Sequence, residues 1–390
     1  WRGASIRFLF NFEKDFPGTR VIKLEQNYRS TPQVLDFANR LISQNSLRRS
    51  KTMWTKEKTG SPVFILETQS KEDEAAKIAE LILRMQQERT QLFPLAVLYR
   101  INSQSLALET EFTRQNIDFK ILKGQRFFDR KEIKDSLALL RLAFNLDDDI
   151  SFLRMIDFLP LGIGAKSLEE LTKHSNEKQI SLFAALKEYT PDKFKAKEIF
   201  SLLYRLNREL TGIANQPGQG EKTRIKVSEI LSRLLEQSGY LEILETKDEE
   251  SRRLNIDELK NFITSWEEKN PGESFNDLLD RMSLEARPKD EEGNSTQVFL
   301  LTMHNAKGLE FPTVVAAGIN STYMPFFMVK GEAEMEEERR LFYVAATRAV
   351  KQLIISTGAG NRSRFLSGIN LSLYSIAYSV NDILESHVPR

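Results

Sequence analysis

The outer parts of the sequence alternate short apolar runs with helical patterns, whereas the middle carries helical patterns alone. Several of the short runs are apolar at successive positions, which is typical of strands that are buried on both faces of a parallel sheet. Alternation of such strands with helices predicts a doubly wound α/β domain. The expected strands are Val21–Leu24, Val63–Glu67, Leu95–Tyr99, Val298–Met303, Thr313–Ile319 and Leu353–Ser356.

The middle of the chain, from about Lys131 to Arg287, shows almost no strand signal. Its apolar residues recur at the spacing of amphipathic helices, and the polar stretches Pro217–Gly220 and Pro288–Gly293 indicate loops. We therefore expect an all-helical domain inserted into the α/β domain, whose sheet resumes near Thr296. The expected helices are Lys134–Asn145, Ser151–Phe158, Ser167–His174, Ile199–Ile213, Val227–Gln237 and Leu254–Glu268.

The composition excludes several kinds of site. Cysteine is absent, which excludes disulfides, thiolate catalysis and the usual zinc or iron–sulfur centres. The three histidines are too scattered in the sequence to indicate a metal site, and no apolar run is long enough to cross a membrane. A cytoplasmic location is expected. The net charge is +1, so nucleic-acid binding would depend on local basic patches.

A first polar cluster, Gln26–Ser30, follows the first expected strand. Ser30 and Gln33 match a helix capping box, and Pro32 suits the first turn of the helix that follows. Ligands of open α/β sheets bind at the carboxyl ends of strands. There, Arg29 could fork onto phosphate oxygens and Tyr28 could stack on a base. An ordinary surface Tyr–Arg pair is the alternative, and the pattern alone favours it.

A second cluster, Glu336–Ala349, places acidic residues before basic ones, as the helix dipole favours. Leu341, Val344, Ala345 and Arg348 are spaced to share one helix face. A charge on this apolar face is costly unless it has a partner. Arg348 could cap the last carbonyls of its own helix, or it could neutralise a phosphoryl group in transfer as an arginine finger. The spacing does not separate these alternatives.

A third cluster, Thr302–Phe311, follows the strand that is expected at Val298–Met303. Thr302, His304 and Lys307 are small or basic donors suited to phosphate contacts, and Glu310 could accept a hydrogen bond from a ribose hydroxyl. A polar loop between two strands explains the same residues, and we favour it for this cluster alone.

Taken together and in this order, the clusters resemble motifs IV, V and VI of the superfamily 1 DNA helicases of the UvrD/Rep/PcrA family. Further segments resemble the end of motif III, a segment between motifs IV and V, the passage into the inserted 2B domain and the closing segment of the family: Trp1–Ala4, Lys51–Thr55, Gly124–Asp135 and Arg364–Leu366.

The resemblance implies a P-loop-NTPase-type, RecA-like parallel sheet domain with an inserted helical domain. Residues 1–19 would be the tail of the first RecA-like domain, and residues 20–130 the first part of the second one. Residues 131–292 would form the helical 2B domain, and residues 293–390 would complete the second RecA-like domain.

The resemblance also implies roles for individual residues. Tyr28 would stack on adenine, Glu310 would contact the nucleotide sugar, and Arg29 and Arg348 would reach the γ-phosphate. Trp1 would stack on a base of single-stranded DNA. The other residues expected to contact DNA are Arg2, Lys51, Trp54, Gly162, Gly164, Thr302 and His304.

Some positions depart from the family pattern. Ala345-Ala346 stand where a glycine is usual, and Ser321–Pro325 replaces an acidic-Gly pair before Phe-Pro, so no DNA contact is assigned to that segment. Leu161–Ser167 looks like a phosphate-binding loop, but Pro160 and Ala165 occupy positions that need glycine. It instead resembles the family's GIG element, whose backbone amides would hold a duplex phosphate, unless it is a plain turn between helices.

No Gly-x-x-x-x-Gly-Lys-Ser/Thr loop occurs in the sequence, and no strand ends in an Asp-Glu pair. The chain begins at Trp1, and we expect its true N-terminus to lie upstream. ATP and Mg²⁺ are expected in the full-length protein, with a first RecA-like domain of the same protein completing the site. This chain alone is predicted to bind neither ATP nor Mg²⁺ tightly. It is also predicted not to hydrolyse ATP. The expected substrates are single-stranded DNA and its junction with duplex, translocated 3′ to 5′; protein partners stay unknown.

Two other readings stay open. The chain could be the helicase part of a recombination helicase–nuclease, or a non-catalytic module that docks DNA or protein. Intact phosphate-facing arginines argue against the second, because a scaffold does not need a charge on an inward helix face.

Overall fold

Seven parallel strands form one sheet in the order β3-β4-β2-β5-β6-β1-β7. The computed structural model describes residues 6–88, 92–189, 197–214, 226–246, 250–286 and 298–384. The α/β fold class that the sequence predicts is confirmed. The strands are β1 (Phe64–Thr68), β2 (Leu95–Tyr99), β3 (Phe119–Ile121), β4 (Val298–Thr302), β5 (Phe311–Ala316), β6 (Ala349–Gly358) and β7 (Ser375–Ala377).

Helices cover both faces of the sheet, and the strands β1, β2, β4, β5 and β6 supply side chains to both faces. In β2, Ala96 and Leu98 pack against one face while Leu95, Val97 and Tyr99 pack against the other. This explains the continuous apolar runs in the sequence. The first face is covered by α2 (Pro32–Ser43), α14 (Glu332–Ala346) and α15 (Arg364–Ser367), and the second by α3 (Lys71–Gln87), α4 (Ser105–Arg114) and α16 (Val380–Leu384).

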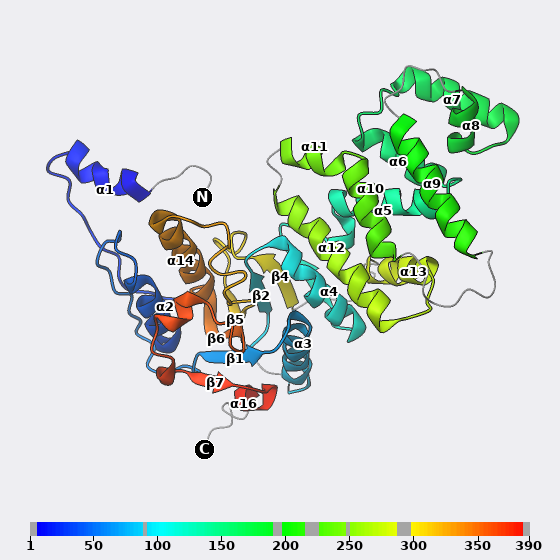
Figure 1. Cartoon of the computed structure of the whole chain (residues 1–390). Coiled ribbons are helices and arrows are strands. Elements are labelled where there is room, and N and C mark those ends of the chain that lie inside the picture. Colours follow the sequence, from blue (N-terminus) through cyan, green and yellow to red (C-terminus); the bar gives the residue numbers. More distant parts are fainter. Residues whose placement is uncertain are drawn as a thin grey trace.

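The described residues between 131 and 286 are helical and contain no strand. Their helices lie beside the sheet (Figure 1) and enclose a separate hydrophobic core. The helices are α5 (Lys131–Phe144), α6 (Asp149–Phe158), α7 (Ala165–Lys178), α8 (Leu182–Tyr189), α9 (Lys197–Ala214), α10 (Val227–Gln237), α11 (Tyr240–Thr246), α12 (Glu250–Lys269) and α13 (Phe275–Ala286). The loops expected at Pro217–Gly220 and Pro288–Gly293 lie outside the described residues. The division of the chain into these four segments stays a prediction.

Short elements connect these layers. Single 3-10 turns form η1 (Asn102–Gln104), η2 (Phe127–Asp129) and η4 (Leu371–Leu373). Helix α1 (Ile6–Asp15) lies apart from the sheet (Figure 1). None of the described helices is long and apolar enough to span a membrane.

Two local predictions were wrong. Val21–Leu24 is not a strand, because the segment runs outside the sheet, where Ile22 and Leu24 stay 71 % and 79 % exposed. Nor does Ser30 cap α2: the helix begins at Pro32 after Thr31, and the Ser30 hydroxyl donates to the backbone oxygen of Ala349 instead (2.7 Å). The placement of Pro32 in the first turn is confirmed.

Candidate nucleotide and nucleic-acid site

The cluster around Arg29 is fixed against the start of β6 rather than at a strand end. The Asn27 side-chain oxygen accepts hydrogen bonds from the backbone amides of Arg29 and Ser30, both at 2.8 Å. The hydroxyl of Ser30 then ties the turn to Ala349 in β6. Such an Asx turn fixes the backbone locally and leaves the neighbouring side chains free to reach outward. The Tyr28 side chain accordingly is 86 % exposed.

Arg348 lies in the turn between α14 and β6. The helix ends at Ala346, so the expected position on an inward helix face was wrong. Its guanidinium donates to the backbone oxygens of Val344 (2.9 Å) and Leu309 (3.1 Å). The first of these bonds is the C-terminal capping contact that was one of the two alternatives. The second joins Arg348 to the segment that carries Glu310.

The three residues expected around a nucleotide's phosphates and sugar lie together. Arg29 forms an ion pair with Glu310, whose carboxylate is more than half exposed. Burial lowers the pKa of Arg348, and the nearby positive charge of Arg29 lowers it further, while Glu310 opposes both effects. Two guanidinium groups that repel each other thus lie near one carboxylate, which is paired with Arg29. This arrangement is suited to an anion of higher charge.

Thr302 and His304 line a second feature, a cleft of about 550 Å³ between the sheet and the inserted helices. Partial burial lowers the pKa of His304, and the charge of Arg100 lowers it further. The ring is therefore neutral at neutral pH and acts as a hydrogen-bonding group. Five basic side chains and one acidic side chain, that of Glu132, also line the cleft; the basic ones are Arg100, Lys123, Arg130, Lys131 and Arg252.

These basic cleft residues were not among the DNA contacts predicted from the sequence. Arg100 directly follows β2, and Lys123 lies two residues beyond β3. Ligands gather at the carboxyl ends of parallel strands, so the position of Arg100 after the predicted strand Leu95–Tyr99 was a usable signal, whereas Lys123 follows a strand that was not predicted. Arg130 precedes α5 and Arg252 lies in α12, and only the tertiary fold brings these distant residues together at the cleft.

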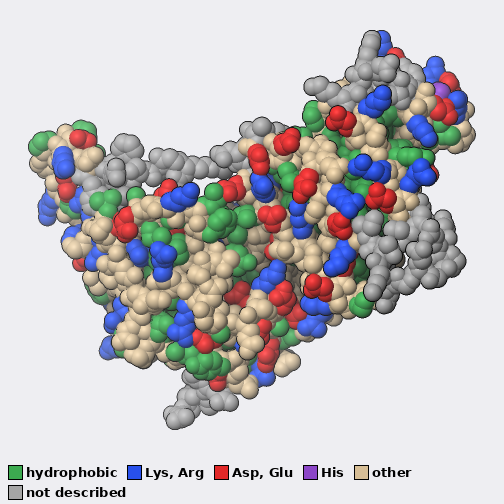
Figure 2. Space-filling view, viewed as in Figure 1, with side chains coloured by type: hydrophobic (Ala, Val, Ile, Leu, Met, Phe, Trp, Pro, Cys, Tyr) green, Lys and Arg blue, Asp and Glu red, His purple; other side chains and the backbone are tan. Residues whose placement is uncertain are grey.

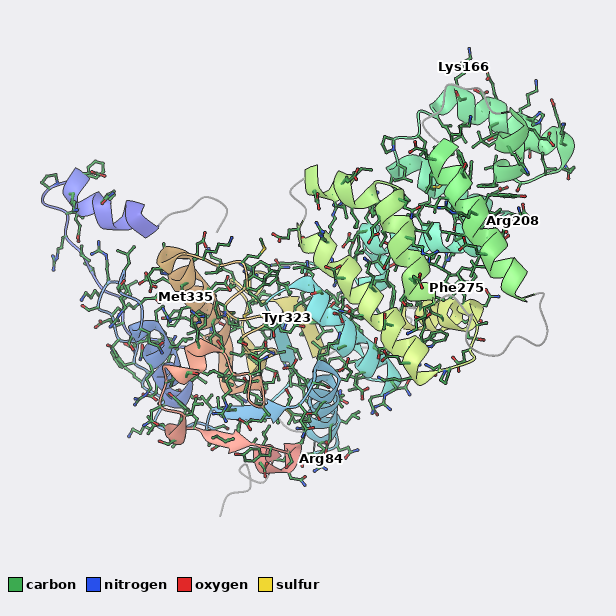
Figure 3. The ribbon with its side chains drawn as sticks, viewed as in Figure 1. Arg84, Lys166, Arg208, Phe275, Tyr323 and Met335 are labelled. Carbon is green, nitrogen blue, oxygen red and sulfur yellow. The ribbon has the colours of Figure 1, made fainter. Side chains whose placement is uncertain are left out.

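The remaining predicted contacts are spread over the molecule. Trp54 is 48 % exposed, and its backbone pairs with Glu25 (3.1 Å) and Asn27 (2.7 Å), while Lys51 is exposed nearby in the chain. Gly162 and Gly164 precede α7, whose start, marked by Lys166 in Figure 3, lies at the end of the insertion farthest from the sheet. Trp1 and Arg2 lie outside the described residues.

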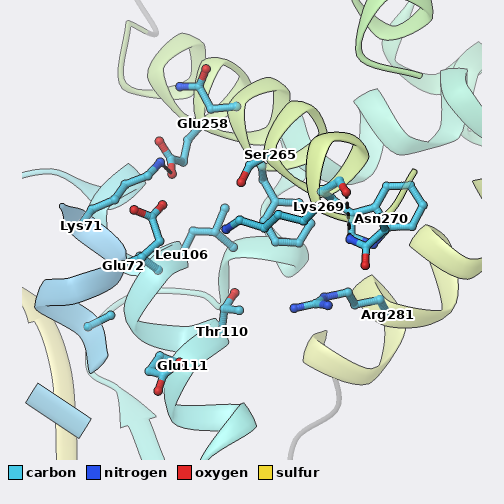
Figure 4. Close-up of a pocket in the computed structure, with 15 residues that line it drawn as sticks. Lys71, Glu72, Leu106, Thr110, Glu111, Glu258, Ser265, Lys269, Asn270 and Arg281 are labelled. Atoms are coloured by element: carbon cyan, nitrogen blue, oxygen red, sulfur yellow. Dashed lines mark hydrogen bonds and ion pairs between the residues drawn. The ribbon is translucent and has the colours of Figure 1, made fainter. Parts of the chain in front are cut away.

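Another pocket, of about 320 Å³, separates α3 and α4 from α12 and α13 (Figure 4). Lys71 and Glu258 bridge it at 2.5 Å, and burial raises the pKa of Glu258 against the opposing effect of Lys71. None of the residues predicted from the sequence lines this pocket. Within the described ranges, no group of three or more His, Asp or Glu side chains could hold a metal ion.

Residues 22–359 match the family model of the UvrD-like helicase C-terminal domain. The chain belongs to this family. It is 37 % identical over 398 residues to the ATP-dependent DNA helicase PcrA of Staphylococcus epidermidis, and 38 % identical over 400 residues to that of Staphylococcus aureus strain MRSA252. Each alignment covers 99 % of this chain and 53 % of the relative, so the chain spans about half the length of these relatives.

A solved C-terminal domain of a possible DNA helicase from Lactobacillus covers 90 % of this chain and 98 % of its own, at 11 % identity and a TM-score of 0.35. That likeness is too weak to add to the family assignment, which rests on the sequence match.

Proposed function

We propose that the chain is the C-terminal part of an ATP-dependent 3′–5′ DNA helicase or translocase of DNA repair or replication. The observation that carries the proposal is the grouping of Arg29, Glu310 and Arg348, three residues from separate motifs, beside the exposed ring of Tyr28. The relatives bear the name of an ATP-dependent DNA helicase, which supports the same activity in the whole protein.

The donor set fits a nucleoside triphosphate. Arg29 and Arg348 supply planar forks that match phosphate oxygens, and Tyr28 offers a free ring face for a base. ATP would supply the phosphoryl group, whose transfer depends on charge neutralisation and positioning. Mg²⁺ would be held by the first RecA-like domain, since the described part of this chain offers no metal cluster.

The hydrogen-bond partners of Arg29 and Arg348 indicate how the site would change when a nucleotide binds. Arg29 would leave Glu310, and Arg348 would leave the carbonyls of Val344 and Leu309, for the more negative phosphate. Glu310 would then be free to accept a hydrogen bond from the ribose. Both arginines lie on this chain, so their pull on the phosphate would close the second motor domain onto the first.

The cleft lined by Thr302 and His304 supports a path for single-stranded DNA. Basic side chains along a groove track a phosphate backbone without reading its sequence. Lys51 and Trp54, and upstream Trp1 and Arg2, would extend that path, and the amides at Gly162 and Gly164 would hold the duplex beyond the junction.

Binding of a short fluorescein-labelled oligothymidine to the chain should weaken steeply as salt is raised. Lys123→Ala should reduce the slope of log K against log salt by about 0.7, because one phosphate contact is lost. Lys178→Ala is a matched control, since Lys178 of α7 pairs with Glu188 of α8, away from the cleft. Anisotropy titrations give both slopes. Equal slopes for wild type and Lys123→Ala would show that Lys123 does not contact the DNA. No binding by wild type would contradict the proposal that the cleft binds single-stranded DNA.

The isolated chain of 390 residues should show no DNA-stimulated ATP hydrolysis. It supplies the arginines, but its sequence has no phosphate-binding loop and its described residues include no group that could hold a metal ion. The full-length protein, assayed in parallel with the same DNA, should be active and should unwind duplexes that carry a 3′ single-stranded tail. Phosphate release by the isolated chain above the blank would contradict the proposal that this chain supplies only part of the nucleotide site. Preference for a 5′ tail would contradict the proposed 3′–5′ direction of translocation.

A further inference from the structure

The loop before α14 carries an exposed aromatic side chain that none of the motifs explains. Phe327 is 58 % exposed and Met328 is 39 % exposed, although both are large and apolar. Figure 2 shows hydrophobic side chains on this face between α14 and the inserted domain. The segment follows Ser321–Pro325, where the sequence departs from the family pattern, and the resemblance assigns no role to Phe327 or Met328.

A short series of contacts joins this loop to the basic cleft. The Arg100 guanidinium lies 4.9 Å from the centre of the Phe326 ring, and the rings of Phe326 and Phe327 are 4.7 Å apart. Arg100 lines the cleft together with Thr302 and His304. Phe327 is therefore joined to the cleft through the ring of Phe326, which contacts the Arg100 guanidinium.

The backbone of the loop is held in place. The amide of Phe326 donates to the Glu338 carboxylate at 3.0 Å, and the amide of Val329 donates to the Phe326 oxygen at 3.0 Å. Glu338 in turn holds Arg100 through both of its oxygens. The same carboxylate thus orients a cation inside the cleft and an aromatic loop at its edge. A fixed aromatic surface loses little conformational entropy when it binds a flat ligand.

We infer that Phe327 is a stacking platform for one base of single-stranded nucleic acid that lies in the adjacent cleft. This inference rests on the proposed function of the cleft. Aromatic faces beside basic grooves bind single strands regardless of sequence, because every base offers a π-face. A protein partner fits less well, since two exposed side chains are far fewer than the 20–30 residues on each side of a typical stable interface.

The test compares Phe327→Ala with wild type in the whole chain, using the oligothymidine and an oligomer of abasic sites as probes. Phe327→Ala should bind oligothymidine about 5- to 100-fold more weakly, the range expected for loss of one stacked base. It should bind the abasic oligomer as wild type does, because only the base is lost from the contact. Phe327→Trp should restore affinity, whereas Phe327→Leu, apolar but not aromatic, should not.

Leu373→Ala is the matched control, because Leu373 is an apolar side chain of similar exposure (52 %) in η4. It should leave binding unchanged, and all variants should unfold at the wild-type temperature. If wild type binds oligothymidine and Phe327→Ala binds equally well, the inference fails while the cleft proposal stands. An equal loss on the abasic oligomer also overturns it. If wild type does not bind, the cleft proposal fails and the inference fails with it.

Discussion

Replacing Arg348 by alanine in the full-length protein should slow ATP hydrolysis by about 10³- to 10⁵-fold while DNA binding is kept. An arginine finger stabilises charge that develops on the transferred phosphoryl group, and losses of this size follow its removal. The site around Arg348 already carries a second guanidinium from Arg29, whose charge lowers the pKa of Arg348. An arginine held beside another cation is suited to an anion that joins both. The turnover number at saturating ATP and DNA is the quantity to measure.

Two further variants separate charge from geometry. Arg348→Lys keeps the positive charge but loses the planar fork, so its activity should fall between that of Arg348→Ala and wild type. Arg114→Ala removes an exposed arginine that pairs with Glu111 on α4, and it should leave turnover unchanged. Because Arg348 also bonds the oxygens of Val344 and Leu309, thermal unfolding must show that the alanine variant is folded. Near-normal turnover in a folded Arg348→Ala protein would defeat the assignment.

The central strands could be predicted because their environment leaves a simple pattern. β2 is buried on both faces, so Leu95–Tyr99 is apolar throughout and its predicted bounds match the structure. The edge strands β3 and β7 were missed, since each has only three residues and includes a polar one. Val21–Leu24 has the composition of a strand but no neighbouring strand to pair with. Composition alone does not show whether such a partner exists.

The candidate site, like the sheet, could be predicted from the sequence only in part. Tyr28, Arg29, Glu310 and Arg348 could be singled out from the order of their motifs. The ion pair between Arg29 and Glu310 could not, because the two residues are 281 positions apart. Arg348 was placed on a helix face by its spacing, yet the helix ends two residues earlier. The helical spacing of 3.6 residues per turn can be followed in the sequence beyond Ala346, where the helix itself ends before β6.

The fold should depend on Glu338 far more than on its neighbour Glu337. Glu338 is 8 % exposed, and its carboxylate accepts from Arg100 at 2.6 and 2.9 Å and from the backbone amide of Phe326. Glu338→Ala would leave the Arg100 guanidinium, itself 14 % exposed, without its carboxylate. Removing one member of a buried ion pair costs about 3–5 kcal/mol. Urea denaturation of the chain should show a loss of this size in the free energy of unfolding.

Glu337→Ala is the control that shows whether burial of Glu338 explains the loss in the free energy of unfolding. Glu337 is the adjacent residue of α14, is 39 % exposed and pairs with Arg340 at 2.9 Å. Exposed pairs contribute about 0–1 kcal/mol, so this variant should be nearly as stable as wild type. Replacing both members of the buried pair, as Arg100→Met with Glu338→Leu, should recover much of the loss, because no unpaired charge stays buried. Equal effects of Glu338→Ala and Glu337→Ala would mean that the Arg100–Glu338 contact does not hold the cleft and the loop together.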